Sequence, residues 1–298
     1  MKILLFGKNG QVGWELQRSL APLGDIIALD RSSSDYCGDL SNLTGIAETV
    51  AAIAPDVIVN AAAHTAVDKA ESEIELARTI NAHASQTLAN AAKQSGALLV
   101  HYSTDYVFNG SGNLAWQETD NTAPLSVYGT TKLEGEQAII ASGCQYLIFR
   151  TSWVYAARGA NFAKTMLRLG AERDKLTVIN DQTGAPTGAD LIADITAHAI
   201  RSVQQQPELA GLYHLVASGE TTWYDYARFV IASARQAGVE LKVADEAILS
   251  TTTAEFPFPA QRPLNSRLNT SKLCASFNLV LPHWQTGVAR MLTEILGK

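Results

Sequence analysis

The stretch from Ile3 to Leu20 constrains the fold more strongly than any other part of the chain. Ile3–Phe6 is a continuous apolar run that predicts a short buried strand, and Gly7, Gly10 and Gly13 follow it directly. The next residues, Trp14–Leu20, have the apolar spacing of a helix. In a strand–turn–helix unit, the first glycine permits a tight turn and the second lets backbone N–H groups approach a pyrophosphate. The third lets the helix pack close to the strand, so this stretch predicts a dinucleotide site.

Further apolar runs alternate with helical patterns as far as about residue 155. They predict strands at Ile26–Leu29, Asp56–Asn60, Ala97–Tyr102 and Tyr146–Phe149. This alternation is typical of an α/β fold, a Rossmann-like doubly wound parallel sheet that binds ligands at the carboxyl ends of its strands. We expect residues 1–155, joined again by about 176–216, to form a dinucleotide-binding domain. We expect about 156–175 and 217–298 to form a smaller substrate-binding domain.

Composition narrows the class of protein. The 298 residues carry a net charge of −6 and contain no Lys/Arg-rich run, which argues against a nucleic-acid partner. The three cysteines are widely spaced and fit reduced thiols better than disulfides. The N-terminal apolar run stops at Gly7, too early for a signal peptide, and no apolar stretch approaches the ~18 residues that span a bilayer. We therefore expect a cytoplasmic protein without membrane segments.

A tyrosine and a lysine stand four residues apart, at Tyr128 and Lys132, after a strand that ends in the hydroxyl residues Ser103 and Thr104. If Tyr128 opens a helix, this spacing puts the phenol and the ammonium on one face. A neighbouring positive charge lowers the pKa of a phenol, which predicts proton delivery to an oxygen that becomes negative. With NADPH or NADH as hydride source, Thr104, Tyr128 and Lys132 would reduce a carbonyl. The alternative is a packed tyrosine and a surface lysine.

Asp30 and Arg31 end the second predicted strand. An acid here can accept hydrogen bonds from the adenosine ribose 2′-hydroxyl, which favours NAD, while Arg31 could meet the 2′-phosphate of NADP. The residues leave the choice of cofactor open.

Arg262–Thr270 is a basic, polar stretch in the predicted second domain. It could hold the diphosphate of a sugar nucleotide through charge-assisted hydrogen bonds, or it could be a surface turn.

Taken together, these motifs resemble the dTDP-4-dehydrorhamnose reductase family, within the extended short-chain dehydrogenases/reductases. The resemblance is carried by Gly7–Gly13, Ala61–Thr65, Ser103–Gly110, Tyr128–Lys132, Arg150–Tyr155, Gly184–Thr187 and Arg262–Arg267. It implies reduction of the C4 ketone of dTDP-4-dehydro-β-L-rhamnose to dTDP-β-L-rhamnose, the last step of dTDP-rhamnose synthesis for cell-surface polysaccharide such as lipopolysaccharide O-antigen. The partner would be the sugar nucleotide.

The resemblance also implies roles for single residues. Tyr128 would donate the proton, Lys132 would assist it and hold the nicotinamide ribose, and Thr104 would position the carbonyl. Asp105 and Trp153 would line the sugar. Cofactor contacts would come from Gly10, Gln11, Val12, Asp30, Asp39, Leu40, Ala63, His64, Thr65 and Tyr102.

Some members of the family form a homodimer through a magnesium ion held by acidic residues. The matching positions are Glu15, Asp190 and Glu294. Asp190 is one methylene shorter than the expected glutamate, a gap that a bridging water could fill, since magnesium often retains water ligands. The alternative is that all three are ordinary surface acids.

Three rival functions remain. A dehydratase of the same fold needs an additional acid where Tyr106 stands, and a 4-epimerase would use the same Thr–Tyr–Lys set, although the loop at 103–110 argues against it. A non-catalytic regulatory subunit could keep the glycine turn without turnover. The intact Thr104, Tyr128 and Lys132 favour catalysis.

Overall fold

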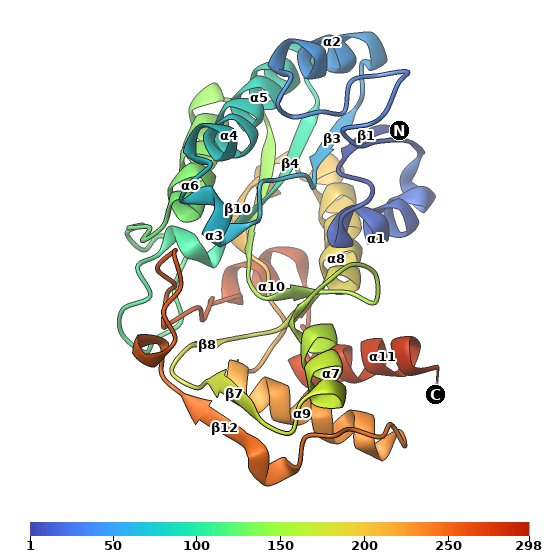
Figure 1. Cartoon of the computed structure of the whole chain (residues 1–298). Helices are drawn as coiled ribbons and strands as arrows, with labels where there is room; N and C mark the ends of the chain where they lie inside the picture. The colour runs from blue at the N-terminus through green and yellow to red at the C-terminus, as the bar shows by residue number, and fades with distance from the viewer. Residues whose placement is uncertain (298) are drawn as a thin grey trace.

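A six-stranded parallel sheet lies at the centre of the computed structural model, which describes residues 1–297 (Figure 1). In spatial order its strands are β2 (Asp25–Leu29), β1 (Lys2–Phe6), β3 (Val57–Asn60), β4 (Leu98–Thr104), β5 (Tyr146–Thr151) and β10 (Gly211–His214). The chain runs outward from β1 to β2 and then returns to β3 on the other side of β1. The strand order therefore reverses between β1 and β3, where such sheets bind ligands. The predicted doubly wound parallel sheet is confirmed.

Helices cover both faces of this sheet, which explains why its strands read as continuous apolar runs. One face packs against α1 (Gln11–Leu20), α8 (Ala189–Gln205) and α10 (Ser271–Phe277). The other packs against α2 (Leu43–Ile53), α5 (Ala84–Ser95) and α6 (Val127–Ser142). Figure 1 shows α1 and α8 on the right of the sheet and α5 and α6 on the left.

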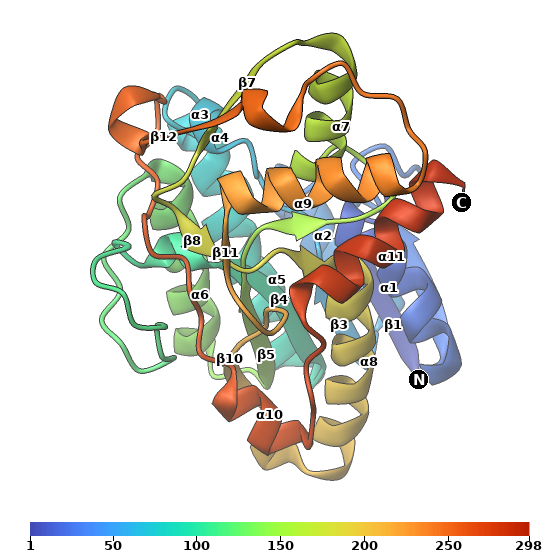
Figure 2. The ribbon, with the colours of Figure 1, turned by 90° about the horizontal axis from the view of Figure 1, so that it is seen from below.

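A smaller body lies across one end of the sheet and has its own apolar core. It contains α7 (Phe162–Glu172), α9 (Trp223–Gln236) and α11 (Trp284–Leu296), together with the paired parallel strands β7 (Leu176–Ile179) and β12 (Ile248–Thr251). In Figure 2, α9 and α11 pass in front of the central strands. The proposed domain division stays a prediction, but β7 pairs with β12 rather than with the central sheet.

Short strand pairs join the two bodies. β6 (Val154–Tyr155) pairs with β9 (Thr187–Gly188), and β8 (Thr183–Gly184) pairs with β11 (Thr221–Thr222). The remaining one-turn helices are η1 (Ala21–Leu23), η3 (Asp105–Val107), η4 (Pro207–Leu209), η5 (Asp245–Ala247) and η6 (Thr253–Glu255).

The helical pattern between Val67 and Ala92 does not form one helix. It divides into α3 (Val67–Ala70) and α4 (Ile74–Arg78), and then a π-helical turn, η2 (Thr79–His83), leads into α5. A π turn inserts an extra residue and rotates the side chains that follow it, and such turns often occur at functional sites.

Among residues 1–297, no helix combines the length and the apolar character needed to cross a bilayer.

Candidate active site

The glycine turn between β1 and α1 packs tightly against the end of β3. Gly7 has a φ of +90°, and a Cβ there would lie 2.8 Å from the backbone of Ala61 and Ala62. A Cβ on Gly13 would lie 2.0 Å from the Gly7 carbonyl oxygen, so α1 can approach the strand only if this residue is glycine. Gly10 caps α1 with its backbone alone. The predicted local roles of Gly7 and Gly13 are therefore confirmed, and Gly13 packs behind the turn.

Two cavities meet at this turn. One has a volume of about 470 Å³, and its lining includes the predicted cofactor residues Gly7, Gly10, Asp30, Arg31, Asp39, Leu40, Ala63, His64 and Thr65. The other has a volume of about 600 Å³, and its lining includes Gly7, Gly10, Gln11, Val12, Ala63, Thr65, Tyr102, Thr104, Asp105, Tyr128, Lys132 and Trp153. Since Gly7, Gly10, Ala63 and Thr65 line both, the cavities form one cleft at the β1/β3 switch point. The structure brings every predicted cofactor and substrate residue except Gly13 to this cleft.

Asp30 lies at the end of β2 on the wall of the smaller cavity. Its Oδ1 accepts hydrogen bonds from the hydroxyl and backbone N–H of Ser32, which lower the pKa of this carboxyl. The Lys8 ammonium lies 3.9 Å from Oδ2, and the Asn9 amide also contacts that oxygen. Asp30 is therefore held as a carboxylate at the place predicted for the adenosine ribose.

Tyr128 lies in the first turn of α6, where the fold presents it to the larger cavity. Ser126 caps this helix, because its Oγ accepts a hydrogen bond from the Gly129 N–H at 3.2 Å. Tyr128 is partly exposed to the cavity, yet the surrounding protein raises the pKa of its phenol to about 12, and a hydrogen bond with Thr104 offsets only part of this rise. The predicted lowering of the phenol pKa is wrong, because burial and the charge of Asp105 both raise this pKa and Lys132 does not lower it.

The Lys132 ammonium group does not contact the phenol. Its Nζ donates a hydrogen bond to the Tyr102 carbonyl oxygen at 2.5 Å and lies 3.1 Å from Nε2 of His101. Burial lowers the pKa of Lys132 to about 8, although the charge of Glu136 acts in the opposite direction. Tyr128 and Lys132 line the same cavity, as their four-residue spacing predicted. The hydrogen-bonding partners of the lysine, however, are on β4.

Thr104 and Asp105 lie where β4 passes into η3. The Thr104 hydroxyl donates to Asp105 Oδ1 at 3.1 Å and accepts from the Tyr106 N–H. Burial raises the pKa of Asp105 to about 6, and hydrogen bonds with Ser266 and Thr104 act against this rise. Oδ2 of Asp105 is buried without a hydrogen-bond partner, so one carboxylate oxygen remains free for a ligand.

Trp153 forms the opposite wall of the larger cavity. Its φ of +48° is rare for a bulky residue, and its ring stacks on Trp223 with a centroid separation of 3.6 Å. Trp223 is the first residue of α9, and its Nε1 donates a hydrogen bond to Gln182 at 3.0 Å. This bond fixes the ring on which Trp153 stacks. No local sequence pattern predicts that Trp223 belongs to this site, because it lies in the other body.

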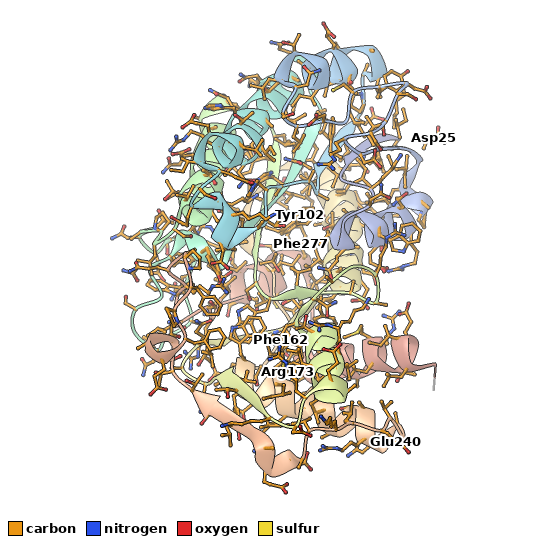
Figure 3. The ribbon with its side chains drawn as sticks, viewed as in Figure 1. Asp25, Tyr102, Phe162, Arg173, Glu240 and Phe277 are labelled. Atoms are coloured by element: carbon orange, nitrogen blue, oxygen red, sulfur yellow. The ribbon has the colours of Figure 1, made fainter. Side chains whose placement is uncertain are left out.

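A third cavity, of about 720 Å³, begins beyond Trp223 and lies within the smaller body. Its lining combines cations with aromatic rings: Phe162, Arg173, Lys175, Trp223, Phe256, Phe258 and Arg262. Figure 3 shows Phe162 and Arg173 in the lower body, below Tyr102. Of the predicted basic stretch, Arg262 lines this cavity and contacts Asp68 at 2.6 Å, whereas Arg267 pairs with Glu220.

A family model described as the RmlD substrate binding domain matches residues 1–296. The dTDP-4-dehydrorhamnose reductase of Escherichia coli K12 is 63% identical over 99% of this chain and 98% of that protein. The chain belongs to the dTDP-4-dehydrorhamnose reductase family.

Solved structures of the family have the same fold. The dTDP-4-dehydrorhamnose reductase of Clostridium acetobutylicum is 36% identical and matches with a TM-score of 0.87 over 100% of both chains. That of Bacillus anthracis, solved in complex with NADP, is 35% identical and has a TM-score of 0.87 over 98% of this chain and 99% of that one.

The magnesium site expected from the reductase family does not form within one chain. Asp190 pairs with Arg290, Glu15 lies 3.4 Å from Arg18, and Glu294 is exposed. Among residues 1–297, no three His, Cys, Asp or Glu side chains are grouped as metal ligands. The Arg290 guanidinium on the Asp190 carboxylate opposes a cation there, so these residues do not fit the metal.

Sequence reasoning also missed two buried polar residues beside the predicted catalytic set of the reductase family. Asn81, in the π turn, accepts from the His64 N–H at 2.9 Å and donates to Thr131 Oγ1 at 3.1 Å, which links the cofactor wall to α6. His101 touches Lys132. His101 lies within the predicted strand Ala97–Tyr102, but only the strand pairing shows what it faces.

Proposed function

We propose that the protein is an NAD(P)H-dependent oxidoreductase that reduces the C4 ketone of dTDP-4-dehydro-β-L-rhamnose to dTDP-β-L-rhamnose. This is the last step of dTDP-rhamnose synthesis, here in the cytoplasm and for cell-surface polysaccharide. The observation that carries the proposal is the single cleft that contains the glycine turn together with Thr104, Tyr128 and Lys132.

The smaller cavity fits the adenosine half of a dinucleotide. Gly7 and Gly10 leave room for a pyrophosphate at the start of α1, where unpaired N–H groups favour an anion. Asp30 can accept from ribose hydroxyls, and Arg31 stands beside it for a 2′-phosphate. When bound, the nicotinamide supplies the hydride.

Residues of the chain then neutralise the negative charge that develops on the carbonyl oxygen. Because its pKa is about 12, the Tyr128 phenol keeps its proton at neutral pH and can give it to an oxygen that becomes negative. Thr104, hydrogen-bonded to the phenol, orients the same oxygen. Lys132 lies deep in the cleft, where its amine can reach a ribose hydroxyl.

The sugar nucleotide fits across the second and third cavities. The sugar would lie against Trp153, with its hydroxyls toward the free Oδ2 of Asp105. Beyond Trp223, Arg173, Lys175 and Arg262 offer positive charge for the diphosphate, and phenylalanine rings offer surfaces for the base.

The test is NAD(P)H oxidation with the ketosugar generated by the upstream enzymes. We expect turnover to fall by about 10²–10⁴-fold in Tyr128→Phe, because the proton donor is lost, while cofactor binding persists. Tyr106→Phe is the matched control, since this ring lies in the same cavity, edge-on to Tyr128 at 5.6 Å. Equal losses in both variants, or full activity in Tyr128→Phe, would contradict the assigned role. Cofactor binding without turnover would favour a regulatory subunit.

We also propose a homodimer, on the resemblance to family members alone. Light scattering of the purified protein, with and without EDTA, tests this. Because Asp190 pairs with Arg290, we expect EDTA to leave the molar mass unchanged.

A further inference from the structure

Three buried side chains from three elements form a chain of hydrogen-bonding groups under the cleft. Asn60 ends β3, His101 lies opposite it on β4, and Lys132 lies on α6. Nδ2 of Asn60 is 3.3 Å from Nδ1 of His101, and Nε2 of His101 is 3.1 Å from Nζ of Lys132. All three residues are at most 2% exposed, so protein groups supply most of their hydrogen-bond partners.

The orientation of Asn60 decides where the imidazole proton lies. Oδ1 of Asn60 accepts a hydrogen bond from the Ala62 N–H at 3.2 Å, which turns its NH₂ group toward His101. A neutral imidazole has one donor and one acceptor nitrogen, so Nδ1 accepts from Asn60 and Nε2 carries the hydrogen. Burial and the charge of Lys132 both lower the pKa of His101, so the ring is neutral.

The Nε2–H group of His101 then points at Lys132. An ammonium has only donors, and two donors 3.1 Å apart repel. A neutral amine has a lone pair that accepts from Nε2–H, while one of its own N–H groups donates to the Tyr102 carbonyl oxygen. All the hydrogen bonds that link Asn60, His101 and Lys132 can therefore form together only when Lys132 is uncharged.

We propose that His101, fixed in its Nε2–H tautomer by Asn60, is a positioning residue that favours the neutral amine of Lys132, so that binding of the nicotinamide cofactor is coupled to uptake of one proton by Lys132. The proton comes from solvent and forms an N–H bond on Nζ. The charged lysine can then donate to ribose hydroxyls, which the neutral lysine does less well. This inference rests on the proposed cofactor site.

The charge state is accessible to titration, because burial lowers the pKa of Lys132 to about 8. The other titratable or charged groups around this end of α6 are Tyr102, Asp105, Tyr128, Glu136 and Arg150. Of these, only Glu136 acts on the pKa of Lys132, and it is shared with Arg150. On the helices packed outside α6, the charged groups have other partners. Arg78 pairs with Glu75 and Glu134, Asp68 pairs with Arg262, and Glu71 accepts from the Val127 N–H.

The experiment counts protons when NADPH binds. Isothermal titration calorimetry in two buffers with different ionisation enthalpies gives the number directly, and the Tyr128→Phe background removes any contribution from the phenol. If the bound lysine has an ordinary pKa near 10.4, uptake should be about one proton near pH 9 and about none near pH 7. The affinity for NADPH should correspondingly fall about ten-fold per pH unit above pH 8.

Two variants test how much the His101 imidazole contributes to proton uptake. In His101→Gln, the amide can turn its oxygen to an ammonium whichever way Asn60 faces, so we expect proton uptake near pH 9 to be largely lost and the affinity profile to flatten. Asn60→Leu keeps the ring but frees its tautomer, and we expect the same result. His214→Gln is the control, because this second buried histidine bonds the Trp116 carbonyl and has no hydrogen bond to Lys132.

The outcomes separate this inference from the proposed function. If the wild-type protein binds neither NADPH nor NADH, the proposed function fails. If it binds cofactor without proton uptake near pH 9, or if His101→Gln takes up as much as the wild type, the role of His101 is overturned. If either variant fails to fold, NMR of the free wild-type protein decides: a His101 ring that carries its hydrogen on Nδ1, or a Lys132 pKa near the ordinary value, overturns the proposal, and a hydrogen on Nε2 together with a Lys132 pKa near 8 supports it.

Discussion

A buried ion pair between α6 and β5 offers the sharpest test of how this part of the fold is built. Arg150 on β5 donates through Nε and Nη2 to both carboxylate oxygens of Glu136, at 2.6–3.2 Å. The two side chains are 5% and 1% exposed, and the guanidinium lies 5.0 Å from the centre of the Phe108 ring. Neither charge can be satisfied by water if the other is removed.

We predict that Glu136→Leu lowers the free energy of unfolding by about 3–5 kcal/mol, because it leaves the Arg150 charge buried and unpaired. This is a large share of the roughly 5–15 kcal/mol that holds a typical domain folded. The double variant Glu136→Leu/Arg150→Met should recover most of the loss, since it removes the uncompensated charge together with its partner.

Urea unfolding followed by circular dichroism measures both values, with the midpoint and the slope reported separately. The pair Arg168–Glu172 provides the control: its single 2.9 Å contact is of similar length, but its side chains are 60% and 54% exposed. Glu172→Leu should therefore cost no more than about 0.5 kcal/mol. If Glu136→Leu costs no more than Glu172→Leu, or if the double variant is as unstable as the single one, burial is not what makes this pair matter.

Three further results are expected. Gly13→Ala should abolish cofactor binding measured by calorimetry, because its Cβ would lie 2.0 Å from the Gly7 carbonyl oxygen; binding with unchanged affinity would contradict the close approach. Burial raises the pKa of Asp105 to about 6 from an ordinary value near 3.9, so the folded state binds more protons between these values and stability should fall as pH rises from about 4 to about 6. Asp105→Asn should flatten that dependence in urea unfolding at pH 4 and pH 7, and an unaltered slope would refute it. Trp223→Ala should raise KM for the sugar nucleotide by up to about ten-fold with little change in kcat, since Trp153 loses its stacking partner; an unchanged KM would show that Trp153 is fixed without it.

The central sheet could be predicted from the sequence because its inner strands are short, apolar and buried on both faces. The observed β1, β3 and β5 begin within one residue of the predicted runs. The strand β12, which was missed, lacks such a signal: it is half-exposed, and its partner β7, a predicted strand, lies about seventy residues earlier in the chain. Their pairing depends on contacts that periodicity does not encode.

The same distinction between local sequence patterns and tertiary contacts applies to the residues of the site. Gly7, Gly10 and the Tyr128–Lys132 spacing are local patterns, and the fold placed all four residues on one cleft. Trp223 reaches the site from the smaller body through tertiary packing. Asn81 is buried in a π turn and links His64 to Thr131, and no composition rule predicts that turn.

The wrong direction predicted for the Tyr128 pKa has a physical cause that bears on mechanism. Spacing along a helix reports which charges are near, but it does not report how far the surrounding protein disfavours an ion. In the folded chain burial dominates, and the Lys132 amine faces Tyr102 and His101 rather than the phenol. A phenol with a pKa of about 12 holds its proton throughout the neutral range, which suits a residue that must still have a proton to give when the carbonyl oxygen becomes negative. The barrier to that transfer can be lowered by charge that develops during the reaction, or by a lysine that becomes charged when the cofactor binds. Activity above pH 8 should therefore depend on the protonation of Lys132.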